Sequence, residues 1–249
     1  MKVLAVYANK GGVGKTSAAV NLAWSAAHDG LRTLLWDLDP QGSASYLFRV
    51  KPKVKGGAQG IISGDRELGG LIKASDFANL DLLPSDFSYR HMDMELDATK
   101  KPTRRIGKLL SSLQDEYDLV VIDCPPTISM ASESVLEAAD VVAVPIVPST
   151  LSARTADQLD GFVRDFEGNP PRLFGFISIV DRRRALHQAT VEALPQAHAW
   201  IRPLCIPSSS VVEQMAVRRA PLHAFAQSTP AAQAYAELWI GVRSALFDA

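Results

Sequence analysis

The chain has 249 residues, of which 47% are hydrophobic and 21% are charged, so a disordered or low-complexity chain is excluded. Its formal net charge is −1 at pH 7, so any binding to nucleic acid or to an anionic membrane must come from a local basic patch. Two cysteines, Cys124 and Cys205, cannot form a disulfide framework, and the N-terminal apolar run is too short for a signal peptide. No apolar run approaches the length of a membrane span, about 20 residues. We therefore expect a cytoplasmic protein without a membrane span.

Short β-branched runs alternate with longer helical patterns along the chain. The runs predict strands over 3–7, 33–36, 80–83, 119–122, 141–145, 174–179 and 203–206, and the helical patterns cover 15–28, 104–116, 132–139, 155–166 and 186–199. Strands that are apolar almost throughout are typical of a sheet buried on both faces. The alternation predicts a single α/β domain over 1–249, a mainly parallel twisted sheet with helices on both faces. Residues 42–70 are expected to form an exposed excursion, and 85–101 has no assigned role.

The first predicted strand is followed by Lys10-Gly11-Gly12-Val13-Gly14-Lys15-Thr16, and Ser17 comes next. This is the P-loop pattern in its strand–loop–helix context. Its glycines let backbone N–H groups turn inward around phosphate oxygens, and the following helix points its positive N-terminus at them. We expect residues 11–17 to bind ATP, with Lys15 reaching the β- and γ-phosphates and the Thr16 hydroxyl ligating Mg²⁺.

Acidic residues end two further predicted strands. The string Asp37-Leu38-Asp39-Pro40-Gln41-Gly42 follows one, and Asp123-Cys124-Pro125-Pro126 follows the other. Carboxylates at the carboxyl ends of strands face the ligand crevice of an open α/β sheet. Asp123 fits a Walker B position, which holds Mg²⁺ through water.

Lys10, at the start of the loop, lies too early to share the task of Lys15. Because of this additional lysine, the sequence resembles the deviant Walker A ATPases, the family of ParA, MinD, the nitrogenase iron protein and Mrp. The resemblance implies that Lys10 contacts the ATP of a partner subunit in a nucleotide-sandwich homodimer. It also implies that Asp39 positions the attacking water, that Asp37 lies nearer the Mg²⁺ shell, and that 125–126 belong to switch II.

The resemblance extends along nearly the whole chain. It places Asp181 near the adenine and Pro207 where ParA proteins carry a similar Ile-Pro pair. The spacing follows small ParA proteins, in which a helix-turn-helix extension of roughly 80–100 residues before the P-loop is absent, so we expect no operator-specific autoregulation. A second iron–sulfur ligand beside Cys124 is not found, because Cys205 lies far downstream.

ParA relatives bind DNA non-specifically through basic residues of the C-terminal part, and phosphate contacts need only Arg or Lys. Candidates here are the C-terminal arginines, which we define as Arg182, Arg183, Arg184, Arg202, Arg218 and Arg219. Two other basic sets are Arg49, Lys51, Lys53 and Lys55, and Lys100, Lys101, Arg104, Arg105 and Lys108. The sequence does not rank the three sets.

The predicted function is a slow ATPase that dimerises on ATP, binds the nucleoid and positions a cargo, stimulated by a small partner or adaptor protein. One alternative is a MinD-like membrane-associated regulator. Its basic amphipathic C-terminal helix is poorly matched, because the apolar stripe of Tyr235, Leu238, Trp239, Val242 and Leu246 has only Arg243 as a cation on its polar side. A third reading is a metabolic enzyme resembling dethiobiotin synthetase.

Overall fold

The computed structural model describes residues 1–166 and 170–248. Its centre is an eight-stranded sheet of order β3-β4-β2-β5-β1-β6-β7-β8, in which only the β3–β4 pair is antiparallel. The strands are β1 Lys2–Val6, β2 Thr33–Asp37, β3 Lys73–Ala74, β4 Leu80–Leu83, β5 Leu119–Asp123, β6 Val141–Ile146, β7 Arg172–Val180 and β8 Ile201–Pro207. The mainly parallel α/β sheet expected from the sequence is confirmed.

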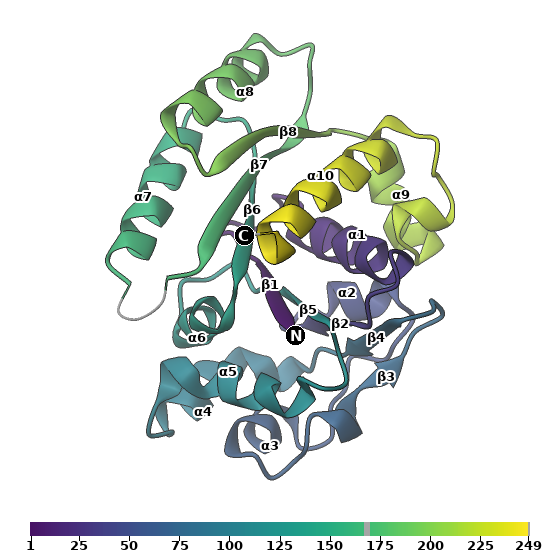
Figure 1. The fold of residues 1–249 in the computed structure, drawn as a ribbon, viewed down its shortest axis with the longest axis vertical. Coiled ribbons are helices and arrows are strands. Elements are labelled where there is room, and N and C mark those ends of the chain that lie inside the picture. The colour runs from purple at the N-terminus through teal and green to yellow at the C-terminus, as the bar shows by residue number, and fades with distance from the viewer. Residues whose placement is uncertain (167–169, 249) are drawn as a thin grey trace.

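Helices cover both faces of this sheet (Figure 1). They are α1 Lys15–His28, α2 Ser43–Leu47, α3 Gly57–Ser63, α4 Met92–Asp97, α5 Arg105–Leu110, α6 Met130–Ala138, α7 Ser152–Arg164, α8 Ala185–Ala197, α9 Ser210–Arg218 and α10 Pro230–Phe247. In the part of the chain that the structure describes, no helix is both long enough and apolar enough to cross a membrane.

The two faces arise from the period-two alternation of the central strands. In β1, Val3 and Ala5 belong to one core cluster, which includes side chains of α3 to α8. The neighbouring residues Leu4 and Val6 belong to the other cluster, which includes side chains of α1, α2, α9 and α10. Because the residues of the central strands are buried on both faces of the sheet, these strands appear as continuous apolar runs in the sequence.

The expectation of an exposed excursion over 42–70 is confirmed only in part, because Lys51, Lys53 and Lys55 are exposed while other residues of the stretch are buried. This stretch holds α2 and α3, and Ala44 and Ile61 are fully buried. Each helix begins after a glycine in the left-handed conformation, Gly42 at φ 66° and Gly56 at φ 89°, rather than after a side-chain cap. Helices of 5 and 7 residues also show too few turns for a periodic pattern, which is why the sequence did not reveal them.

Other elements differ mainly at their ends. The helix expected over 104–116 is shorter, because α5 is flanked by single 3₁₀ turns at Pro102–Arg104 and Ser111–Leu113. The region 85–101 contains α4, and neither α9 nor the antiparallel edge strand β3 was foreseen.

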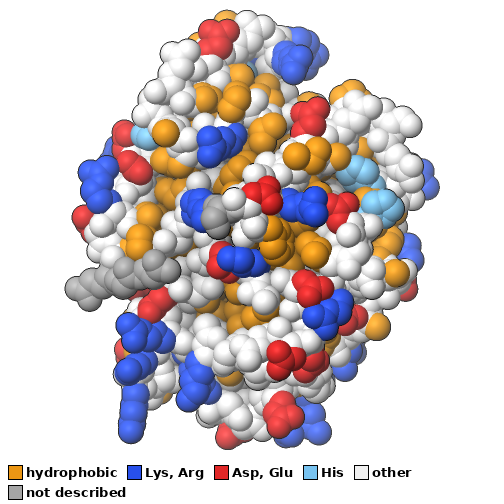
Figure 2. Space-filling view, viewed as in Figure 1, with side chains coloured by type: hydrophobic (Ala, Val, Ile, Leu, Met, Phe, Trp, Pro, Cys, Tyr) orange, Lys and Arg blue, Asp and Glu red, His pale blue; other side chains and the backbone are white. Residues whose placement is uncertain are grey.

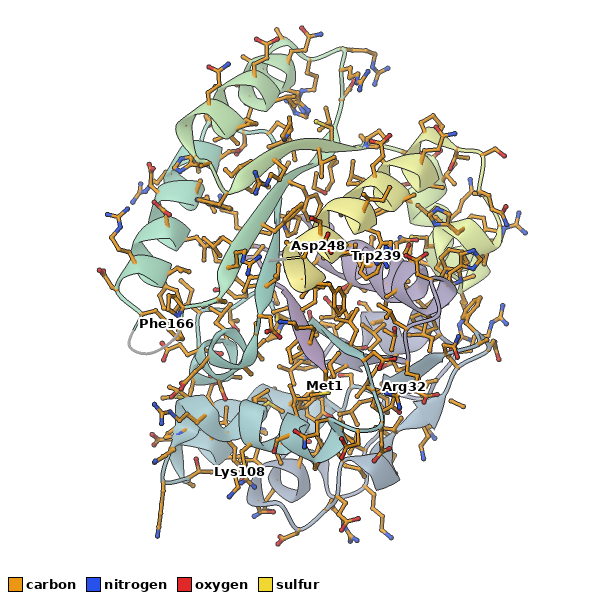
Figure 3. The ribbon with its side chains drawn as sticks, viewed as in Figure 1. Met1, Arg32, Lys108, Phe166, Trp239 and Asp248 are labelled. Carbon is orange, nitrogen blue, oxygen red and sulfur yellow. The ribbon has the colours of Figure 1, made fainter. Side chains whose placement is uncertain are left out.

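The C-terminal helix α10 packs its apolar stripe into the core, as expected. Tyr235, Leu238 and Val242 are at most 1% exposed. Figure 3 labels Trp239 where α10 passes α1, and its indole Nε1 donates a hydrogen bond of 2.7 Å to Asp29 at the end of α1. The stripe is therefore occupied within the chain.

Candidate functional site

The candidate site lies at the carboxyl edge of the sheet, beside its central strand β1. Strand β1 pairs with β5 on one side and β6 on the other, and the chain turns from β1 through residues 7–14 into α1. The chain leaves β1 toward β2 on one side of the sheet order and leaves the adjacent β6 toward β7 on the other, and open α/β sheets have a crevice for ligands at such a point.

Glycines shape the loop between β1 and α1. Gly12 and Gly14 have φ values of 72° and 91°, which residues with a Cβ rarely adopt. Cβ atoms at Gly11 and Gly12 would meet nothing within 4 Å, so the loop is open toward solvent there, whereas a Cβ at Gly14 would lie 2.9 Å from the Ser178 Oγ of β7. The loop thus forms an open cradle seated on β7, and Ser178 is a neighbour that the sequence pattern did not identify.

Lys15 curls back over this loop. Its side chain is 6% exposed, and its Nζ donates a hydrogen bond of 2.9 Å to the Lys10 carbonyl oxygen. Burial lowers the pKa of Lys15, and the carboxylates of Asp123 and Asp39 act in the opposite direction. Lys10 itself is exposed, so its ammonium group is free to reach beyond this chain.

Asp37 and Asp123 end neighbouring strands in direct register, because they are Cα partners across the β2–β5 pair. Both side chains are fully buried. Neither oxygen of Asp123 has a hydrogen-bond partner in the described part of the chain, and Asp37 leaves Oδ1 unpaired while Oδ2 accepts from the Ser45 N–H and hydroxyl. Burial raises the pKa of Asp37 to about 6, and burial together with Asp37 raises the pKa of Asp123 well above its ordinary value.

Unpaired buried carboxylate oxygens require compensation, and a hard divalent cation supplies it. Thr16 lies against Asp123, where its hydroxyl opposes the rise in that pKa. Over residues 1–166 and 170–248, no group of three or more His, Cys, Asp or Glu side chains is arranged as a metal site. The unpaired oxygens of Asp37 and Asp123 beside the Thr16 hydroxyl fit a Mg²⁺ ion that also takes water and phosphate oxygens.

Asp39 lies just beyond β2 at the same edge. One of its carboxylate oxygens accepts a hydrogen bond of 2.9 Å from the Gln41 N–H, and the Ser85 hydroxyl donates to its carbonyl oxygen. The side chain is half-buried and its charge acts on Lys15, Asp37 and Asp123. The structure thus brings together the loop lysine and the three aspartates that the sequence selected.

Hydrogen bonds of the Asn21 side chain hold the first turns of α1 in place. Val13 is buried, Ser17 is half-buried, and the Ser17 carbonyl oxygen accepts a hydrogen bond of 2.8 Å from Asn21. The Asn21 Oδ1 accepts another from the Leu222 N–H at 2.9 Å, which links α1 to the chain after α9. Asn21 is fully buried and was missed, because a single Asn in a helix carries no sequence signal.

The two residues placed near the adenine lie where β7 and β8 end. Asp181 follows β7, but its carboxylate is engaged by the Arg183 guanidinium, with two contacts of 2.9 Å that lower the pKa of Asp181 to about 2. Pro207 ends β8 and borders a hollow of about 370 Å³, shared with Arg182 and Cys205. The Asp181 carboxylate is therefore already paired within the chain.

The C-terminal arginines do not form one free surface. Arg183 is paired with Asp181, and Arg202 lies 5.8 Å from the centroid of the Phe174 ring. Arg219 is only half-exposed: its guanidinium lies over the Tyr46 ring and its Nε donates to the Tyr46 carbonyl oxygen. Arg182, Arg184 and Arg218 are exposed.

Arg219 takes part in a reciprocal contact between α2 and α9. It follows α9 in the left-handed conformation, at φ 52°, and bonds to the last turn of α2. Arg49 follows α2, also left-handed at φ 60°, and its Nη2 donates to the Arg218 carbonyl oxygen. The two arginines border a cleft of about 740 Å³ that reaches Thr16 and Ser17, so α9 is joined to the segment after Asp39.

A family model described as an AAA domain matches residues 1–170. The sporulation initiation inhibitor protein Soj of Bacillus subtilis is 35% identical over 164 residues, which are 66% of this chain and 65% of the relative. A ParA family protein of Chlamydia pneumoniae is 31% identical over 174 residues, 69% of this chain and 68% of its own length. The chain thus spans just under two thirds of the Soj relative.

Solved structures show the same fold over nearly the whole chain. Cobyrinic acid a,c-diamide synthase from Mycobacterium smegmatis, with bound ATP analog and magnesium, has a TM-score of 0.81 at 24% identity, covering 98% of this chain and 95% of that one. A putative plasmid partition protein from Borrelia burgdorferi, bound to AMPPNP, has a TM-score of 0.83 at 23% identity, covering 98% and 99%. With the family model matched over more than half of its length and a ParA family protein aligned over two thirds of its own, this chain belongs to the ParA family.

Proposed function

We propose that this protein is a positioning ATPase, which binds ATP with Mg²⁺ and hydrolyses it in cycles that move or segregate a cargo. The observation that carries the proposal is the pair of buried carboxylates, Asp37 and Asp123, with unpaired oxygens beside a buried P-loop lysine. The unpaired carboxylate oxygens would be satisfied by the cation of a bound nucleotide, and Lys15 would contact its phosphates.

The residues have separable tasks. The N–H groups of residues 11–17 cradle phosphate oxygens, and Lys15 replaces its bond to the Lys10 carbonyl oxygen by contacts to the β- and γ-phosphates. Thr16 and Asp123 hold Mg²⁺, with Asp37 next to that shell. The cation neutralises phosphate charge when it is bound. Asp39, half-buried with one engaged oxygen, keeps a second oxygen for the attacking water.

The site is open on the side of Lys10. The Lys10 side chain is exposed, and the Lys10 carbonyl oxygen accepts the hydrogen bond from Lys15. In the proposed homodimer, two chains close around two nucleotides and each Lys10 contacts the phosphates of the partner. Dimer formation would therefore depend on ATP, and Asp181 and Pro207 would lie at the base end of the nucleotide.

The proposed dimer binds DNA without sequence preference. Its proposed protein partner is a small stimulating protein or a cargo adaptor. Support comes from the relatives: Soj is a sporulation initiation inhibitor, a Caulobacter vibrioides relative is a chromosome partitioning protein, and the Borrelia neighbour is a putative plasmid partition protein. The proposed location is the cytoplasm, on the nucleoid.

A membrane-bound, MinD-like role is less well supported, because the apolar stripe of α10 is buried against the chain's own core. A metabolic phosphoryl-transfer enzyme uses the same fold, and differs in having no need of DNA. Both alternatives are separated from the proposal by one set of measurements.

The experiment compares wild type with Lys15→Ala and Asp39→Ala in ATP hydrolysis, sedimentation and gel shifts of random-sequence DNA, each with ATP, ADP or no nucleotide. Lys15→Ala should lose nucleotide binding and, with it, dimer and DNA binding. Asp39→Ala should keep nucleotide binding, hydrolyse at least tenfold more slowly, and accumulate as an ATP-bound dimer on DNA. Equal DNA affinity of wild type in all three states, or no DNA affinity at all, would contradict the proposal.

A further inference from the structure

A basic groove lies away from the C-terminal arginines, between the segment that joins α2 to α3 and the segment that leads from α3 to the edge strand β3. Its volume is about 930 Å³. Its cations are Lys51, Lys53, Lys55, Arg66 and Lys73, and its acids are Asp65 and Glu67. The remaining lining residues are Val50, Val54, Gly70 and Leu71. We call this hollow the lysine groove. Two segments, 50–55 and 65–73, form its walls.

The local structure holds the lysines outward. Val54 is 5% exposed and belongs to the core, its N–H donates a bond of 2.8 Å to Asp86, and its carbonyl oxygen accepts one of 3.0 Å from Gly57. Lys53 and Lys55, on either side of this buried anchor, are exposed. A short basic segment fixed in this way loses little backbone entropy when it binds a ligand.

The cations of the groove are not neutralised within the chain. Among the described residues, none of the five takes part in an ion pair with N–O separation within 4.0 Å. All five are exposed. Five positive charges against two negative ones on one concave surface produce a local positive field that the net charge of −1 conceals.

In the hollows beside the other two basic sets, acids match or outnumber the cations. The hollow beside 100–108, about 610 Å³, presents Arg104 against three acids, Glu133, Glu137 and Asp165. The hollow at the C-terminal arginines presents Arg182 against Glu237. On the face shown in Figure 2, basic side chains gather at the lower left, over the end of the molecule that holds α4 and α5, and elsewhere they alternate with acidic ones.

The groove is also joined to the candidate nucleotide site. It shares Val50 and Lys51 with the 740 Å³ cleft that reaches Thr16. Gly42, which follows the Asp39 loop, packs so closely on the lysine segment that a Cβ there would lie 3.0 Å from the Cβ of Pro52. A shift of the Asp39 loop would therefore be transmitted directly to the residue between Lys51 and Lys53.

We propose that the lysine groove binds the phosphodiester backbone of DNA, and that it is the main DNA contact of this chain. The inference rests on the proposed function and gives its DNA-binding surface a location. Lysines supply point charges without base-reading geometry, as sequence-independent phosphate contact requires. The link through Gly42 and Pro52 places this surface under the control of the nucleotide loop.

The test compares wild type with two triple variants that remove equal charge. One is Lys51→Gln, Lys53→Gln and Lys55→Gln, and the matched control is Lys100→Gln, Lys101→Gln and Lys108→Gln, all six being exposed lysines. The probe is a random-sequence DNA duplex, titrated with ATP and Mg²⁺ at several salt concentrations. ATP hydrolysis without DNA and thermal melting verify that each variant is folded and loads nucleotide.

The groove variant should bind DNA about tenfold or more weakly, and the log–log salt slope should flatten by roughly 5, which is about 0.9 for each of three lysines in two chains. The control variant should keep most of the affinity and slope. If wild type binds DNA and the groove variant binds equally well, the inference is wrong and the proposed function stands. If wild type binds no DNA with ATP, the proposed function itself fails. A polyglutamate peptide is titrated in parallel. If the groove variant keeps its affinity for DNA but loses binding to this peptide, the groove binds an acidic protein segment and the inference is wrong.

Discussion

Replacing Asp123 by Asn should stabilise the protein without ligand and abolish its response to Mg²⁺ and ATP. Asp123 is fully buried, both of its oxygens lack partners, and it lies opposite Asp37 in the sheet. Asn has the same shape and no charge, and its amide can donate to the unpaired Oδ1 of Asp37. The substitution removes an uncompensated buried charge and its repulsion of a second one.

The size of the gain follows from the pKa shifts. The pKa of Asp37 rises from 3.8 to about 6, and burial together with the neighbouring Asp37 raises the pKa of Asp123 well above its ordinary value. A raised carboxyl pKa means that the folded state favours the neutral form. Stability is therefore fully present below about pH 4 and is lost as pH rises through the folded-state values. At about 1.4 kcal/mol for each pKa unit, we expect Asp123→Asn to stabilise the ligand-free chain by roughly 1–3 kcal/mol at pH 7.5.

For a chain of this size, 1 kcal/mol corresponds to about 2–4 °C in Tm, so the expected rise is roughly 2–10 °C. The assay is thermal melting in EDTA at pH 4.5 and pH 7.5, then with Mg²⁺ and ATP. The gain should appear at pH 7.5 and shrink at pH 4.5. Added Mg²⁺ and ATP should raise the Tm of wild type and not that of the variant.

Asp118→Asn is the control, because Asp118 is a half-buried surface carboxylate whose pKa is lowered to about 2 by Arg32. Its removal breaks a favourable interaction and should not stabilise the chain. A ligand-free Asp123→Asn variant that melts at or below wild type at pH 7.5 would refute the reasoning about the buried pair.

Three further predictions concern the glycines of the P-loop, the exposed Lys10 and the C-terminal helix α10. Gly14→Ala places a Cβ 2.9 Å from Ser178 Oγ at φ 91°. We therefore expect at least tenfold weaker ATP binding by calorimetry and a free energy of unfolding that is lower by about 1–3 kcal/mol. The control Gly11→Ala has open space at its Cβ and should change the free energy of unfolding by less than about 1 kcal/mol. Lys10→Ala should leave ATP affinity within about threefold of wild type and abolish ATP-dependent dimerisation in sedimentation, since the side chain is exposed; an unchanged dimer would contradict its assignment to the partner's nucleotide. Trp239→Phe removes the bond to Asp29 and should lower the free energy of unfolding in urea by about 1–2 kcal/mol, with ATP hydrolysis unchanged; equal stability would show that this bond is not needed to hold α10 on α1.

Much of the site is encoded locally and could be predicted. The glycines of the P-loop are needed for φ values that other residues avoid, and the helix from Lys15 to His28 was foreseen to its last residue. Asp37, Asp39 and Asp123 follow apolar runs whose burial on both faces is visible in their composition.

Residues that act through distant partners could not be predicted in this way. Ser178 meets Gly14, Asn21 bonds to Leu222, and Arg219 bonds to Tyr46, in each case across more than 160 positions of sequence. An isolated Ser, Asn or Arg has no periodic pattern and no motif of its own. Its partner is chosen by packing that the rest of the chain creates.

By itself, the sequence determined the central strands, the helix after the P-loop and the place of the phosphate cradle, because backbone preference and burial patterns act over a few neighbouring residues. Only the tertiary structure decided that β2 pairs with β5, which sets Asp37 opposite Asp123. It also decided that Lys51–Lys55 face Arg66 and Lys73 across one groove, while Arg183 and Arg219 are engaged within the chain. Strand order and the neutralisation of charges depend on contacts between segments far apart in sequence, and only the packed fold brings those segments together.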